Sequence, residues 1–247
     1  MHSYEILAVT AGVFLLAGFV KGVIGLGLPT VAIGLLGLMM TPAQAAAILV
    51  VPSLFTNVWQ FVAGGGLLAL VRRLWPMLLG ICIGTFIGAT LLPHDNSGRA
   101  TVWLGLALVL YAGLGLIKIH IKAPRHAELW LGLLMGSLTG AITVATGIFV
   151  IPGTPYVQSL EFERDKMVQA LGLSFTTSTI ALAAALGYAG EIHVTLAIPS
   201  LVALGAALVG MWLGQIVRGL VKAETFRLWF FLGLLALGVH LALRGLL

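Results

Sequence analysis

The sequence predicts an all-α integral membrane protein built from two inverted repeats of about five hydrophobic segments each. Three observations predict this fold: the composition, the positions of the charged residues, and a pattern that recurs in the second half. Of 247 residues, 60% are hydrophobic and 9% are charged, and the mean hydropathy is +1.11. A soluble domain carries roughly 25% charged residues, so this chain could not cover a water-facing surface. The composition therefore excludes a soluble enzyme, a nucleic-acid-binding protein and a disordered scaffold.

The charged residues divide the chain into candidate membrane segments. A transmembrane helix needs about 20 apolar residues to cross a hydrocarbon core of roughly 30 Å. The uncharged run 22–71 would be about 75 Å long as one helix, so it must fold back. The uncharged run 129–160 is also too long, and Pro152-Gly153-Thr154-Pro155 interrupts it. We expect eight long helices, near 5–24, 43–63, 73–92, 100–119, 127–148, 166–187, 193–218 and 225–246, and two short ones, near 29–40 and 152–161.

The two halves of the chain look alike. Gly18-x-x-x-Gly22 recurs as Gly136-x-x-x-Gly140, and each motif precedes a Gly/Pro-interrupted stretch. Gln44, in the second long segment, recurs as Gln169. We therefore expect one membrane domain made of a first repeat, 1–122, and a second repeat, 123–247.

The distribution of positive charge indicates how many segments cross the membrane. Lys and Arg are enriched on the cytoplasmic side of membrane proteins. If the short segments also cross and the N-terminus lies outside, 11 of the 13 Lys and Arg residues are cytoplasmic. If the short segments do not cross, the split is 6 to 7 and carries no signal. The charges therefore favour five crossings in each half, with the second half inverted.

Interrupted helices in a membrane predict a binding cavity. Unpaired backbone N–H and C=O groups cannot face lipid, so an interruption must be buried in protein or line a wet cavity. A helix N-terminus in such a cavity presents free N–H groups and a partial positive charge, which suit an anion. Glycines four residues apart have a second interpretation, close helix packing. The candidate binding residues at the two interruptions are Gly22, Gly25, Gly27, Thr143, Thr146 and Gly147.

Polar residues inside the long segments extend the candidate site. No Asp, Glu or His lies in the middle of a long segment, which favours an anionic substrate over a cation or a proton relay. Lys21 is either a cytoplasmic flank, the interpretation we favour, or a cation at the mouth of the first interruption. We expect the hydroxyls near 174–179 to face Thr143 and Thr146, although a lone Ser or Thr can bond its own helix. The candidate binding residues in the long segments are Gln44, Asn57, Gln169, Ser174, Thr177 and Ser178.

Catalysis and cofactors are not expected. The single cysteine, Cys82, excludes a disulfide framework and a metal site built from cysteines. The segments offer no nucleophile–base set and no paired histidines, so we expect no catalytic residue, no metal and no cofactor. The expected partners are a small anionic substrate and the lipid bilayer, and no nucleic acid.

At both interruptions the sequence resembles the sulfite exporter TauE/SafE family of bacterial membrane permeases. The similar stretches are 18–29, 136–156 and 165–175. The resemblance implies a multi-pass protein of the bacterial inner membrane that moves sulfur-containing anions such as sulfite, sulfonates or sulfoacetate. Family members often carry a longer glycine run where this chain reads Gly-Leu-Gly-Leu-Pro at 25–29, which leaves the ligand open.

Together these observations predict a secondary transporter of small anions that works by alternating access, and the resemblance implies that these anions contain sulfur. The two interruptions would meet near the membrane midplane and hold the anion. Other interpretations are an anion channel, a transporter of a non-sulfur organic anion, an intramembrane enzyme and a structural membrane subunit.

Overall fold

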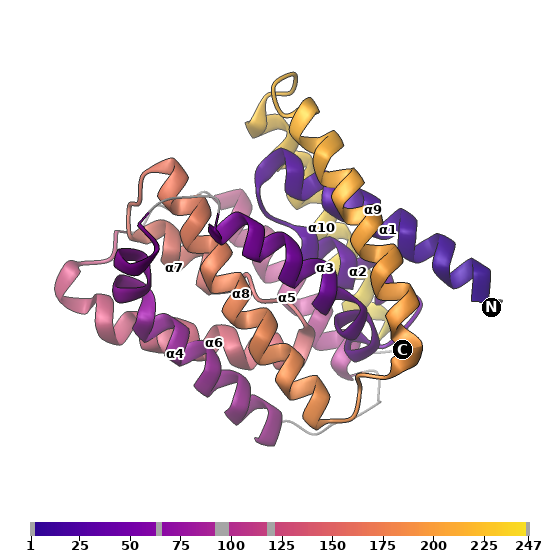
Figure 1. The fold of residues 1–247 in the computed structure, drawn as a ribbon, viewed down its shortest axis with the longest axis horizontal. Coiled ribbons are helices and arrows are strands. Elements are labelled where there is room, and N and C mark those ends of the chain that lie inside the picture. Colours follow the sequence, from indigo (N-terminus) through magenta and orange to yellow (C-terminus); the bar gives the residue numbers. More distant parts are fainter. Residues whose placement is uncertain (1–2, 63–65, 92–98, 118–121, 246–247) are drawn as a thin grey trace.

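The computed structural model describes residues 3–62, 66–91, 99–117 and 122–245, and within them the chain forms helices joined by short connections (Figure 1). In these described stretches, eight helices are long and apolar enough to cross a membrane. The helices of the first half are α1 (Ser3–Ile24), α2 (Leu28–Leu36), α3 (Pro42–Val62), α4 (Leu67–Leu91) and α5 (Arg99–Ile117). Those of the second half are α6 (Glu128–Thr146), α7 (Gly153–Ser159), α8 (Arg164–Tyr188), α9 (Ala197–Val217) and α10 (Ala223–Arg244). The predicted all-α membrane fold is confirmed.

The order of long and short helices is the same in both halves, and α2 and α7 are the two short members. The largest difference from the predicted bounds is at α4, which begins at Leu67, six residues before the predicted segment. The predicted segment has its edge at Arg72 and Arg73, but the helix continues through both. Its first turns extend beyond the apolar stretch, and there Arg73 pairs with Glu128 of α6. Lys118, one of the residues in the charge count, lies outside the described residues.

Two helix pairs pack in parallel, and each joins the two halves. A Cβ atom on Gly80 of α4 would lie 2.4 Å from Leu133 O of α6, and Gly88 is close to Ala141 further along both helices. Likewise, Gly18 of α1 abuts Ala207 of α9, and Gly22 abuts Met211. Residue numbers rise together along each pair, so the two helices of each pair run in the same direction. The small-residue interpretation of the recurrent glycines is thus confirmed for Gly18, Gly22, Gly136 and Gly140.

Two other pairs, also between the halves, pack antiparallel. Ser53 of α3 contacts Thr179 of α8, whereas Phe61, near the end of α3, contacts Gln169 near the start of α8. In the same way Gly105 of α5 lies against Ala242 of α10, and Gly115 lies against Phe231. Residue numbers rise on one helix as they fall on the other.

These directions bear on the number of membrane crossings. Successive membrane-crossing helices alternate in direction, so if only the eight long helices crossed, α3 and α8 would be parallel, and so would α5 and α10. Counting α2 and α7 as crossings makes both pairs antiparallel and leaves the α1–α9 and α4–α6 pairs parallel, as the contacts require. Each half therefore contributes five segments, and the second half is inverted relative to the first.

Candidate functional site

The first interruption separates α1 from α2. Gly25 and Gly27 adopt φ values of 79° and 103°, a left-handed backbone that favours glycine. Gly25 N still donates to Lys21 O at 2.8 Å, and Thr30 Oγ1 donates to Gly27 O at 3.0 Å. Leu28 then starts α2, and Pro29 follows in its first turn, where the missing N–H of proline is tolerated. Local hydrogen bonds thus satisfy the backbone N–H of Gly25 and the carbonyl of Gly27 at this interruption.

Lys21 lies inside the protein at this interruption. It occupies the last turn of α1, and its residue exposure is 5%. Its Nζ donates to Thr56 Oγ1 at 3.0 Å and to Asn57 Oδ1, both on α3. The favoured interpretation of Lys21 as a cytoplasmic flank is wrong, because the close contact of α1 with α9 brings this turn into the interior and α3 covers the side chain.

The hydrogen bonds continue from Lys21 into the second half of the chain. Asn57 Nδ2 donates to Ser53 Oγ at 3.0 Å, and Ser53 Oγ lies 3.3 Å from Thr179 Oγ1 of α8. Thr179 donates its own hydrogen to Phe175 O at 2.7 Å, so Ser53 is the donor to Thr179. Every partner of Lys21 in this chain of bonds is neutral.

The second interruption, between α6 and α7, has no charged side chain at the matching position. Gly147 takes φ 76°, and Thr146 Oγ1 accepts a hydrogen bond from Ile148 N at 3.1 Å. Thr143 donates to Thr139 O. Thr139 stands 118 residues after Lys21, as Gly136 does after Gly18. The two interruptions are alike in backbone but not in charge.

The short helix α2 links the two interruptions. Gly27 precedes it, and Ile33, further along α2, lies against Gly147 of the second interruption. About 9 Å of helix separates Gly27 from Ile33, at 1.5 Å per residue. Asn57, Gly25, Gly27 and Gly147 therefore belong to one region of the protein, although Gly147 and Asn57 share no hydrogen bond.

Gln44 lies at the start of α3, whereas Gln169, a residue of α8, contacts the other end of α3. Gln44 Oε1 accepts from Thr41 N at 3.2 Å, and Gln44 N donates to Thr41 Oγ1 at 3.3 Å. This reciprocal pair is a capping box, which the Thr-x-x-Gln spacing could have revealed. Gln169 Nε2 donates to Phe61 O at 3.0 Å, and about 25 Å of helix separates Gln44 from Phe61. Both amides thus have structural partners in this conformation.

The hydroxyls of the predicted cluster on α8 mostly bond their own helix. Ser174 donates to Ala170 O and Thr177 to Leu173 O. Among these described residues, none bonds to Thr143 or Thr146. Ser178 differs, because its Oγ is fully buried and has no hydrogen-bond partner.

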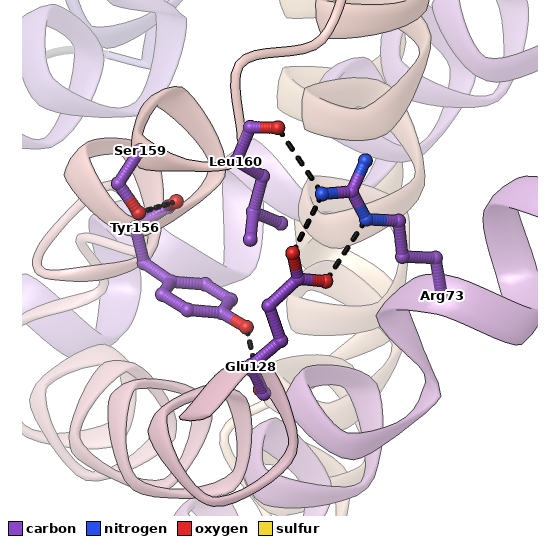
Figure 2. A network of polar contacts seen from close by, with 5 residues as sticks. All are labelled: Arg73, Glu128, Tyr156, Ser159 and Leu160. Carbon is purple, nitrogen blue, oxygen red and sulfur yellow. Dashed lines mark hydrogen bonds and ion pairs between the residues drawn. The ribbon is translucent and has the colours of Figure 1, made fainter. Parts of the chain in front are cut away.

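A second polar network fixes the other short helix, α7 (Figure 2). Arg73 of α4 makes a two-pronged ion pair with Glu128 at 2.7 and 3.0 Å and donates to Leu160 O at 3.2 Å. Tyr156 of α7 donates to Glu128 O at 2.8 Å. These bonds tie α7 to the α4–α6 pair. The polar groups of this network satisfy one another's hydrogen-bonding capacity, so the network has a structural role.

Ser53 and Thr56 are not among the predicted binding residues, whereas Lys21 is the less favoured of two interpretations there and Thr179 belongs to the predicted hydroxyl cluster. Helical spacing could have found Lys21, because it lies between Gly18 and Gly22, which both face α9. Ser53 and Thr56 lie within one turn of Asn57 on α3. Among the described residues, no group of three His, Cys, Asp or Glu side chains could hold a metal ion.

Comparison with known proteins agrees with this architecture. A model of the family described as sulfite exporter TauE/SafE matches residues 10–241, which include both interruptions and the whole Lys21 network. No curated protein and no solved structure matches the chain. The match extends over nearly the full length of an inverted membrane fold. The chain therefore belongs to the sulfite exporter TauE/SafE family of membrane transporters.

Proposed function

We propose that this protein is a secondary transporter of small sulfur-containing anions, such as sulfite or a sulfonate, in the inner membrane of a bacterial cell. Lys21 would bind the anion, with Asn57 and Thr56 holding its ammonium group in place. The observation that carries the proposal is a buried lysine at a helix interruption whose hydrogen-bond partners are all neutral.

The chemistry of Lys21 supports an anionic ligand. A buried charge without a partner of opposite sign is unfavourable by several kcal/mol. An ammonium group has three N–H donors, and the protein accepts from it at two positions, Thr56 Oγ1 and Asn57 Oδ1. An anion beside Lys21 would supply both the missing negative charge and an acceptor for the third donor.

The packing of the helices supports alternating access. Gly-mediated contacts join α1 to α9 and α4 to α6, so each pair forms a tightly packed unit made from both halves. The antiparallel α3–α8 pair lies between these two units, because α3 contacts α9 and α8 contacts α4. Rocking of one unit against the other would open the Lys21 region to each side in turn, as in other transporters with inverted repeats.

Transport by reconstituted protein tests the proposal. Sulfite flux would be measured in liposomes containing the wild type, Lys21→Met or Lys122→Met. We expect Lys21→Met to reduce flux at least about tenfold, because truncating a buried, hydrogen-bonded charge typically costs 2–5 kcal/mol of binding energy. Lys122→Met removes an exposed lysine paired with Glu161 and should leave flux unchanged.

Two further results would contradict the proposal. Equal flux by Lys21→Met and the wild type would exclude Lys21 as the binding cation. Flux that rises linearly with sulfite concentration, without saturation, would indicate a channel. A panel including short carboxylates would show whether the preferred anion contains sulfur.

A further inference from the structure

We infer that the species bound at Lys21 carries a single negative charge, as a sulfonate or hydrogen sulfite does, and that dianions such as sulfate and fully ionised sulfite are excluded. This inference rests on the proposed function and specifies its substrate. It follows from the number of charges inside the protein and from their unequal distribution between the halves.

Lys21 is the only Lys, Arg, Asp or Glu among the buried residues that the structure describes. The helices packed around it add no charge nearby. None of α2, α3 and α9 contains an ionisable side chain, and those of α8 lie in its first and last turns. On α10, Arg227 donates to Gly115 O of α5, while Glu224, His240 and Arg244 are exposed. The interior thus offers a ligand one positive charge.

The second half provides no second cation. Thr139 occupies the position equivalent to Lys21, and Leu182 stands 125 residues after Asn57, as Gln169 does after Gln44. Both of these residues are buried. Although the fold is repeated, its charge is not, so a ligand between the interruptions meets a single ammonium group.

Charge balance then discriminates between ligands. A monoanion beside Lys21 forms a neutral pair, whereas a dianion leaves one uncompensated negative charge in a medium of low dielectric constant. The remaining donors are neutral, and most of the hydroxyls already bond backbone carbonyls. The unpartnered Ser178 Oγ, next to Thr179, could donate one further hydrogen bond but adds no charge. The site is therefore suited to one negative charge.

The test compares three anions in proteoliposomes across the second ionisation of sulfurous acid, with equal pH on both sides and the membrane potential clamped. Over this pH range methanesulfonate is always a monoanion and sulfate is always a dianion, whereas sulfite changes from a monoanion to a dianion as the pH rises. Methanesulfonate flux corrects for any titration of Lys21 itself. Protein-free liposomes and liposomes with Lys21→Met measure leakage.

We expect sulfite flux, divided by methanesulfonate flux, to fall about tenfold for each pH unit above that ionisation, in proportion to the monoanion. Sulfate flux should remain at the leakage level. A ratio that is constant or rises with pH, or sulfate flux equal to methanesulfonate flux, would overturn the single-charge inference but leave transport intact. No flux of any of the three anions would overturn the proposed function, and the inference with it.

Discussion

At the residue scale, Lys21 is the one buried Lys, Arg, Asp or Glu in the part of the chain that the structure describes. The position of Lys21 near the end of a hydrophobic segment favoured a solvated flank, because charges usually mark such ends. The structure instead buries the ammonium group against Thr56 and Asn57. Asn57 was predicted from the sequence as a polar residue in mid-segment, and it is the predicted residue that contacts this cation. The inward direction of Lys21 depends on how closely α1 approaches α9, which segment boundaries do not reveal.

Asn57→Asp tests the role of Lys21 as an anion site. The new carboxylate would have almost the shape of the amide and would form an ion pair with Lys21, so the ammonium charge would no longer be available to a ligand. We expect sulfite flux to fall at least about tenfold, with thermal stability equal to or above that of the wild type. Gln158→Glu makes the same amide-to-acid change at an exposed position and should leave flux unchanged. Normal flux in Asn57→Asp would contradict the binding role of Lys21.

At the element scale, glycine stripes hold the long helices together. Lipid gives no hydrophobic drive for helices to associate, so close van der Waals contact between backbones provides much of the stability. Gly84 illustrates the fit, because a Cβ atom there would lie 1.9 Å from Ser137 O of α6. Gly205 of α9 has no neighbour within 4 Å of a Cβ atom. A glycine in a hydrophobic segment therefore does not by itself indicate a close helix contact.

The substitution Gly84→Ala should separate α4 from α6 and destabilise the protein by about 1–3 kcal/mol, the usual range for an overpacked contact. Unfolding of the purified protein in detergent measures the change. Gly205→Ala adds the same methyl group where there is space, and it should be neutral or stabilising by up to about 1 kcal/mol. If both variants had the same stability, the α4–α6 contact would not depend on glycine.

At the scale of the whole molecule, the sequence was sufficient for the helices but not for the site. Charged residues and Gly/Pro interruptions located ten segments, since hydropathy and backbone breaks are local properties. The positive charges predict five crossings in each half, and the directions of the α3–α8 and α5–α10 pairs agree with that count, although α2 and α7 are themselves too short to span a bilayer as helices. Which side chains meet inside the protein was harder to predict, because it depends on contacts between halves. Gln44 and Gln169 occupy matching positions in the repeat, yet Gln44 lies at the start of α3 and Gln169 contacts the end of α3.

Cysteine labelling in intact cells tests this topology. In a Cys82→Ser background, Lys122→Cys and Ile192→Cys would each place one thiol at an exposed position. The helices α6, α7 and α8 lie between these two positions, so three crossings put them on opposite sides of the membrane. We expect a membrane-impermeant maleimide to label Ile192→Cys from outside and to leave Lys122→Cys unlabelled. Labelling of both from outside would mean that α7 does not count as a crossing.

Direct binding is the measurement that tests the central claim, an anion site at Lys21. The apparent melting temperature of the detergent-purified wild type and of Lys21→Met would be measured against increasing sulfite and methanesulfonate. A ligand that binds only the folded state stabilises it by about 2.7 kcal/mol at a concentration 100 times Kd. We predict a saturable rise for the wild type and none for Lys21→Met. Equal rises in both proteins, or a rise in neither, would contradict the claim that Lys21 binds the transported anion.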